Sequence, residues 1–256
     1  MDAGPAGRRF AAPDPTDIAA LAAAHDIVQE RIAGACARVG RDPAGVRLVA
    51  VSKTVPPDRI RAAVAAGLTV LGENRVQELE TKVPLVPGAT WHLIGPLQSN
   101  KARRAVEAAD IIETVDSVEL ARRIDRLVRE VRGLPPTGPV PAASRIRVLV
   151  QANVDDDPAK AGFEPTGLRA SLGALLDLEA LEVAGLMTVG RLVVEPEAAR
   201  PTFRRLADLS TELRSIDPRL GPELSMGMTV DYPVAVEEGA TIVRVGRALF
   251  GERAAA

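Results

Sequence analysis

One lysine stands where covalent chemistry could take place. Lys53 comes just after the apolar run 48–51 (LVAV), where a buried strand would end. A lysine with an ordinary pKa of about 10.4 is protonated at neutral pH, so its amine is not a nucleophile. Burial in a cavity and a nearby cation would lower that pKa and free the amine to form a Schiff base. Taken alone, Lys53 is better explained as a solvated lysine at a strand end, so other residues must decide.

Two glycine-containing segments near the end of the chain have the features of a phosphate site. The first, Ser225-Met226-Gly227, offers a hydroxyl and successive backbone N–H groups, with no bulky side chain at Gly227. Gly246 similarly allows an anion to approach the backbone closely. Phosphate sites of α/β barrels commonly occupy the loops after the seventh and eighth strands. Each glycine, taken separately, could equally be a simple turn residue.

Arg244 is the most diagnostic charged residue of the sequence. It interrupts the apolar segment 241–246 (TIVRVG), and an arginine in such a strand needs a reason to be there. An outward-facing Arg244 would pair with a carboxylate at the surface. An inward-facing Arg244 could donate a hydrogen bond to an aromatic nitrogen, which would have to stay unprotonated because arginine keeps its proton. We favour the inward orientation.

Three other polar residues have simpler explanations. Asn74 could face a ligand, although capping of the following helix is the commoner role for such a residue. His92 lies within a strand pattern and is interpreted as a satisfied core histidine rather than a base. Cys36 falls on the first helix, at the wrong end of a barrel for catalysis, and is interpreted as a packing residue.

The elements expected to position these residues are short runs rich in β-branched residues. Eight such runs occur, at 47–52, 69–72, 91–94, 111–115, 147–153, 183–187, 223–225 and 242–245. Helical patterns lie between them, which is typical of βαβ units and a parallel sheet. We predict an α/β protein with a single (β/α)8 TIM barrel, whose functional residues lie at the C-terminal ends of the strands. An open doubly wound sheet is the alternative.

The segments outside this alternation complete the expected domain organisation. A long helix at about 17–39 precedes the first strand and should take the place of a last helix in the outer ring, because only a short tail follows Phe250. Residues 1–15 are expected to form a flexible tail and residues 16–256 the barrel domain. The Gly- and Pro-rich segment 133–144 (GLPPTGPVPAAS) is predicted to be a surface loop far from the site.

Composition excludes several classes of function. Aromatic residues make up only 2% of the chain and the net charge is −2, so neither stacking platforms nor a basic surface for nucleic acid is expected. One cysteine and two histidines exclude an intramolecular disulfide and leave little for a metal site. No segment approaches the roughly 20 apolar residues of a membrane span, and no secretory signal is evident. A cytoplasmic location is therefore expected.

The chain resembles a known family along nearly its whole length. It is similar to the pyridoxal 5′-phosphate (PLP) homeostasis proteins, which share the fold of the alanine racemase N-terminal domain, a fold type III PLP-binding barrel. The matching stretches are AVSKTVPPDRIRAAVAAG (50–67), GENRVQE (72–78), WHLIGPLQSNKAR (91–103), VDSVELA (115–121), VLVQANVDDDPAKAGF (148–163), GLMTV (185–189), LSMGMTVDYPVAVEEGAT (224–241) and VRVGRALFG (243–251).

This resemblance assigns a role to each candidate residue. It implies that Lys53 forms the Schiff base with PLP, that Arg244 contacts the pyridine nitrogen, that Ser225, Gly227 and Gly246 help to hold the phosphate, and that Asn74 lines the pocket. Two positions depart from the family pattern: Thr229 stands where Ser is usual, and Arg75 replaces a common Tyr. Both departures keep a polar group.

The expected function is that of a carrier. The resemblance implies intracellular PLP homeostasis and delivery to apo PLP-dependent enzymes, without turnover. We expect a monomer or weak dimer. An amino-acid racemase would need a second base on the other face of the cofactor ring. In alanine racemases this base is a Tyr, and its action depends on an additional β domain. Only five residues follow Gly251, and Tyr232, the sole tyrosine, is interpreted as a packing residue. A PLP-dependent racemase and a Schiff-base aldolase remain the alternatives, and residual racemase-type activity stays open.

Overall fold

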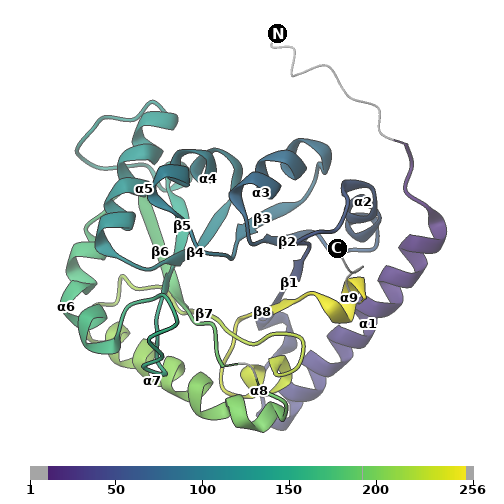
Figure 1. Ribbon diagram of the computed structural model, residues 1–256. Coiled ribbons are helices and arrows are strands. Elements are labelled where there is room, and N and C mark those ends of the chain that lie inside the picture. The colour runs from purple at the N-terminus through teal and green to yellow at the C-terminus, as the bar shows by residue number, and fades with distance from the viewer. Residues whose placement is uncertain (1–10, 192, 252–256) are drawn as a thin grey trace.

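The computed structural model describes residues 11–191 and 193–251, and the strands within them close into a barrel (Figure 1). All pair in parallel in the order of the sequence, and β1 pairs with β8. Their bounds are β1 Arg47–Val51, β2 Val70–Glu73, β3 Thr90–Leu93, β4 Ile111–Val115, β5 Ile146–Gln151, β6 Leu181–Met187, β7 Glu223–Ser225 and β8 Ile242–Val245. The predicted closed barrel is confirmed, and the open sheet is excluded.

The strands begin and end within two residues of their predicted positions. The agreement arises because strands buried on both faces appear in the sequence as short, continuous apolar runs. In β4 and β8 every residue is buried, which is typical of a parallel sheet covered by helices. Strands from different parts of the barrel wall contribute to a small apolar cluster in the barrel interior. It consists of Val49, Ile94, Leu149, Ala184, Met187 and Ile242. A larger apolar cluster lies between the strands and the helices.

The helices form an outer ring around the strands. Their bounds are α1 Pro15–Arg38, α2 Pro57–Ala65, α3 Val76–Lys82, α4 Ala102–Ala108, α5 Val118–Val131, α6 Pro165–Leu176, α7 Arg200–Ile216, α8 Tyr232–Glu237 and α9 Arg247–Phe250. Local chemistry explains where some begin: the side chain of Ser117 accepts a hydrogen bond from the backbone N–H of Leu120, which caps α5. Among residues 11–191 and 193–251, no helix is both long and apolar enough to cross a membrane.

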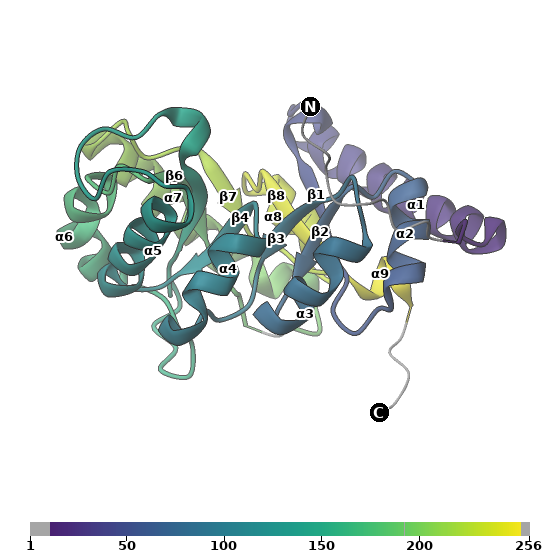
Figure 2. The same ribbon diagram turned by 90° about the horizontal axis from the view of Figure 1, so that it is seen from above.

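The N-terminal helix occupies the position that the sequence predicted for it. Helix α1 packs against α8, α2 and α9, on the side of the barrel opposite α6 (Figures 1 and 2). Cys36 is buried on this helix among apolar residues, as expected of a packing residue. The short helix α9 follows β8 and ends at Phe250, the residue after which the sequence analysis placed a short tail. Residues 1–10 of the predicted tail lie outside the described residues.

The insertion-like segment 133–144 connects α5 to β5, so it lies at the N-terminal ends of the strands. Arg129 of α5 anchors it, donating hydrogen bonds to the carbonyl oxygens of Pro135 at 2.9 Å and Gly138 at 3.0 Å. Functional side chains of such barrels gather at the opposite, C-terminal ends of the strands. This placement agrees with the prediction of a loop far from the site.

Candidate functional site

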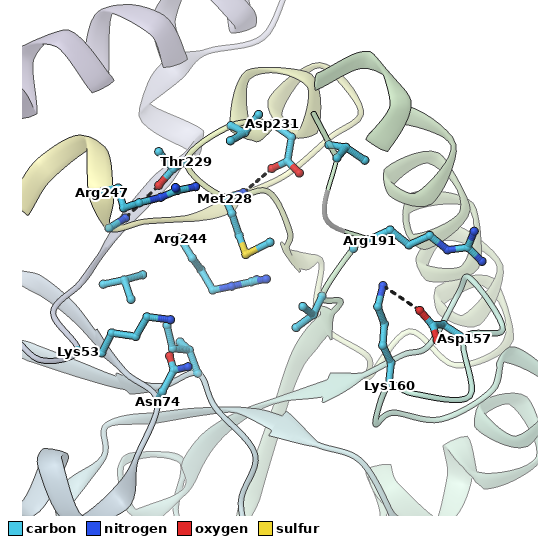
Figure 3. Close-up of a pocket in the computed structure, with 17 residues that line it drawn as sticks. Lys53, Asn74, Asp157, Lys160, Arg191, Met228, Thr229, Asp231, Arg244 and Arg247 are labelled. Atoms are coloured by element: carbon cyan, nitrogen blue, oxygen red, sulfur yellow. Dashed lines mark hydrogen bonds and ion pairs between the residues drawn. The ribbon is translucent and has the colours of Figure 1, made fainter. Parts of the chain in front are cut away.

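A cavity of about 820 Å³ opens at the C-terminal ends of the strands. Residues that lie in or after β1, β2, β3, β5, β6, β7 and β8 line its wall, which includes Lys53, Asn74, Gly190, Arg191, Met228, Thr229, Asp231, Arg244 and Gly246. Lys53, Asn74 and Arg244 lie on one side of the cavity, and Asp157, Lys160 and Arg191 lie on the other (Figure 3). The cavity therefore occupies the end of the barrel at which the sequence predicted a site.

Lys53 lies in the tight connection between β1 and α2, and its side chain extends into the cavity beside Asn74 (Figure 3). Asn74 follows β2 and does not cap the next helix, because the N-cap position of α3 belongs to Arg75. In the structure Asn74 therefore lines the cavity and does not have the commoner capping role.

Arg244 points into the barrel, as the sequence analysis favoured. Its guanidinium is almost completely buried and donates hydrogen bonds to the hydroxyl of Ser225 at 2.6 Å and the carbonyl oxygen of Thr188 at 2.8 Å. Burial lowers the pKa of Arg244, and the nearby carboxylates of Glu113 and Asp231 oppose that shift. The group still reaches the cavity wall, so it presents a fixed cationic donor to a ligand.

Two of the predicted phosphate contacts lie deeper than expected. Ser225 is fully buried, and its hydroxyl donates to Glu113 Oε2 at 2.5 Å while it accepts from Arg244. Gly227 adopts a φ of 90°, and a Cβ there would come within 2.5 Å of the Ala235 Cβ, so only glycine fits this turn. Neither Ser225 nor Gly227 is part of the described cavity wall, whereas Gly246 and the hydroxyl-bearing Thr229 are.

The loop that carries Thr229 is closed by its own hydrogen bonds. Asp231 accepts a bond from the Met228 backbone N–H at 2.6 Å, and the Asp231 N–H donates to the Met228 carbonyl oxygen at 3.1 Å. Burial raises the pKa of Asp231, although the Met228 N–H and Arg244 act in the other direction. The Thr229 hydroxyl faces the Gly246 N–H at 3.4 Å, which brings the segments after β7 and β8 together. Hydroxyl and backbone donors of this kind suit a phosphate group.

A buried carboxylate that the sequence analysis missed supports Arg244 from below. Glu113 on β4 is fully buried, 2.5 Å from the Nδ1 atom of His92 and 3.9 Å from Arg244. Burial alone would raise the pKa of Glu113, but the hydrogen bond and attraction of His92, together with Arg244, outweigh burial and lower it. Glu113 interrupts an apolar strand (IIETV), so the argument that singled out Arg244 could have found it.

His92 differs in part from the satisfied core histidine that was predicted. It is fully buried and does not line the cavity, which agrees with a core position. Only Nδ1 is hydrogen-bonded, however, and Nε2 has no hydrogen-bond partner among the described residues. No group of three or more His, Cys, Asp or Glu in the described part of the chain could hold a metal ion.

The fold and this cavity define a class of α/β barrel. The sequence model of the family described as alanine racemase, N-terminal domain, matches residues 26–254. The pyridoxal phosphate homeostasis protein of Aquifex aeolicus is 40% identical over 228 residues, which cover 88% of this chain and 95% of the relative. The corresponding protein of Pseudomonas aeruginosa is also 40% identical, over 88% of this chain and 93% of the relative.

A solved structure extends the comparison to three dimensions. PipY of Synechococcus elongatus, whose structure has PLP bound, is 41% identical and superposes with a TM-score of 0.73. The match covers 88% of this chain and 100% of PipY. The chain therefore belongs to the pyridoxal phosphate homeostasis protein family, whose members carry the barrel of the alanine racemase N-terminal domain.

Proposed function

We propose that this chain binds PLP through a Schiff base on Lys53 and acts in PLP homeostasis and delivery in the cytoplasm. The observation that carries the proposal is that a lysine amine and a buried guanidinium face one cavity from neighbouring strands (Figure 3). The relative from Synechococcus elongatus, which has PLP bound in its structure, supports the choice of ligand.

The residues of the cavity fit the parts of this ligand. PLP supplies a reactive aldehyde, an aromatic ring with a nitrogen, and a phosphate. In the proposed arrangement, the Lys53 amine would condense with the aldehyde and release water, Arg244 would donate to the ring nitrogen, and Asn74 would form the wall beside the lysine. Thr229 and Gly246 hold the phosphate directly.

The two deeper residues have a supporting part in this arrangement. Ser225 fixes the guanidinium of Arg244 by a hydrogen bond of 2.6 Å, and Gly227 permits the turn that leads to Thr229. We therefore propose that Ser225 and Gly227 shape the phosphate site from below, since their described positions lie outside the cavity wall.

We further propose that the chain is a carrier and that it performs no turnover of its own. Arg244 keeps its proton, so the ring nitrogen that it contacts stays unprotonated and the ring is a weak electron sink. Tyr232, the sole tyrosine, is fully buried and does not line the cavity, so it cannot serve as a base opposite the lysine. The curated relatives are named as homeostasis proteins rather than as enzymes. Apo PLP-dependent enzymes are the proposed recipients, and a monomer or weak dimer the proposed state.

The absorption spectrum of the purified, PLP-loaded protein tests the central claim. A visible band that borohydride abolishes, with the reduced adduct mapped to Lys53, is the expected result. Lys53→Ala should remove the band, whereas Lys101→Ala should keep it, because Lys101 does not line the cavity. Mapping of the adduct to Lys82, Lys101 or Lys160, the other lysines of the sequence, would overturn the assignment.

A further inference from the structure

A second lysine lies directly behind the connection that carries Lys53. Lys82 is the last residue of α3, and its side chain is only 7% exposed. Its ammonium donates hydrogen bonds to the carbonyl oxygen of Ser52 at 2.9 Å, to Glu73 at 2.7 Å and to Glu78 at 3.1 Å. A buried lysine with three acceptors in this geometry is held rigidly, and it is turned away from the cavity.

The same cluster also holds the residue that follows Lys53. Glu78 accepts a hydrogen bond from the backbone N–H of Thr54 at 3.0 Å, with the carboxylate oxygen that contacts Lys82. Lys82 is thus hydrogen-bonded directly to the peptide group that joins Ser52 to Lys53. Through Glu78, it is also linked to the peptide group that joins Lys53 to Thr54. The hydroxyl of Ser52 adds a bond of 2.7 Å to Glu73, which closes the cluster.

The backbone at this point needs such support. Thr54 has a φ of 66°, in the left-handed region that a β-branched residue rarely adopts. A conformation of this kind costs about 1–3 kcal/mol and persists only where the surrounding structure enforces it. The hydrogen bond from the Thr54 N–H to Glu78 ties this residue to helix α3.

Charge also favours a geometric role for the cluster. Burial raises the pKa of Glu73, against the opposing effect of Lys82 and Ser52. Burial would also raise the pKa of Glu78, but the Thr54 N–H and Lys82 outweigh it and lower that pKa. Buried ion pairs often add little net stability, because desolvation offsets their attraction. A cluster of three ionisable groups at this place is therefore better explained by its effect on the backbone around Lys53 than by a contribution to the stability of the fold.

We propose that Lys82, Glu73 and Glu78 are positioning residues that fix the backbone on both sides of Lys53, so that its amine meets the carbonyl carbon of PLP. The proposal rests on the proposed function of Lys53. Orientation has a large effect on reaction rates, because a displacement of about 1 Å can slow a reaction roughly 100-fold. The expected consequence of loosening the cluster is slow bond formation in a pocket that still binds the ligand.

Two measurements on each variant separate these effects. The first is the rate at which the visible band develops when apo-protein is mixed with PLP in a stopped-flow instrument. The second is the Kd for 4′-deoxypyridoxine 5′-phosphate, which has the ring and phosphate but no aldehyde to react. The ratio of the two reports how well Lys53 is placed, independently of how well the pocket holds the ring and phosphate.

The variants are Glu78→Ala, which removes the bond to Thr54, and Lys82→Met, which removes all three bonds of the ammonium. Glu80→Ala is the matched control on the same helix, because Glu80 pairs with Arg104 at the surface. Glu78 is 26% exposed, so Glu78→Ala is expected to fold even where Lys82→Met does not.

We expect Glu78→Ala to lower the rate at which the visible band develops about 10–100-fold, while the Kd of the analogue changes less than about threefold. Glu80→Ala should change neither quantity. An unchanged rate in folded Glu78→Ala, or an equal loss of rate and analogue affinity, would overturn the proposal. The absence of any visible band in the unmodified protein would instead refute the proposed function itself, so the two failures are distinguishable.

Discussion

Replacement of Glu113 by alanine tests the buried support of Arg244 most directly. The carboxylate is fully buried, 2.5 Å from His92, 2.5 Å from the hydroxyl of Ser225 and 3.9 Å from Arg244. Its removal leaves the buried guanidinium without the carboxylate that has the larger effect on it, with Asp231 as the remaining one. His92 and Ser225, which also lose a hydrogen-bond partner, are both fully buried.

The magnitude follows from the distances. Two unit charges about 4 Å apart attract by about 4 kcal/mol at an effective dielectric constant of about 20. Removal of one partner from a buried ion pair typically costs about 3–5 kcal/mol, since an uncompensated charge stays behind. We expect Glu113→Ala to lower the free energy of unfolding by about 3–5 kcal/mol. For a chain of this size, that corresponds to a fall in Tm of roughly 6–20 °C.

Urea unfolding of the apo-protein, followed by circular dichroism near neutral pH, measures this loss. Glu107→Ala serves as the control, because Glu107 is 49% exposed and its ion pair with Arg103 at 3.8 Å lies at the surface. Exposed pairs of this kind contribute at most about 1 kcal/mol. If Glu113→Ala lost no more stability than Glu107→Ala, the reasoning about a compensated buried charge would be refuted.

The pH dependence of the same loss has a definite sign. The pKa of Glu113 is lowered in the folded protein, below its ordinary value of 4.5. A carboxylate of this kind adds stability that is fully present above the pKa of the unfolded chain and is lost as the pH falls through the folded pKa. The stability difference between the unmodified protein and Glu113→Ala should therefore shrink below about pH 4.5. A difference that grows on acidification would contradict this assignment.

Three further predictions concern the ligand and the loop. Pyridoxal should bind much more weakly than PLP in a titration of the visible band, because each lost charge-assisted hydrogen bond costs about 1.5–3 kcal/mol; equal affinities would remove the phosphate site. The loaded protein should restore an apo PLP enzyme even with a scavenger of free PLP present, and should not exchange the Cα proton of free amino acids into deuterated water. Rapid exchange of the Cα proton with multiple turnovers would favour the racemase alternative. If the apo-enzyme regained activity no faster than PLP dissociates spontaneously from the loaded protein, only a role in PLP storage would remain. Replacement of 134–141 by a short Gly-Ser linker should leave the rate of band formation unchanged, because that loop lies at the other end of the barrel.

Much of the fold could be predicted from the sequence because its strands are buried on both faces. Such strands appear as short, continuous β-branched runs, and glycines and caps separate them from the helices. Once the barrel is assumed, the position of Lys53 at a strand end and of Arg244 within an apolar strand follows from the order of residues. The resemblance to a family added the ligand, which no pattern of residues could name.

The partners of these residues were decided only by the tertiary structure. The bond between Ser225 and Glu113 joins residues 112 positions apart, and closure of β1 on β8 brings the two ends of the barrel sheet together. Whether Ser225 lines the cavity or lies beneath it depends on the direction of one side chain in a closed sheet. Lys82 shows the same limit, because its contacts with Ser52 and Glu73 arise where α3 packs against β2 and its last side chain reaches the residue after β1. Residue types and spacing determine which elements form, whereas contacts between distant segments depend on how those elements pack in three dimensions.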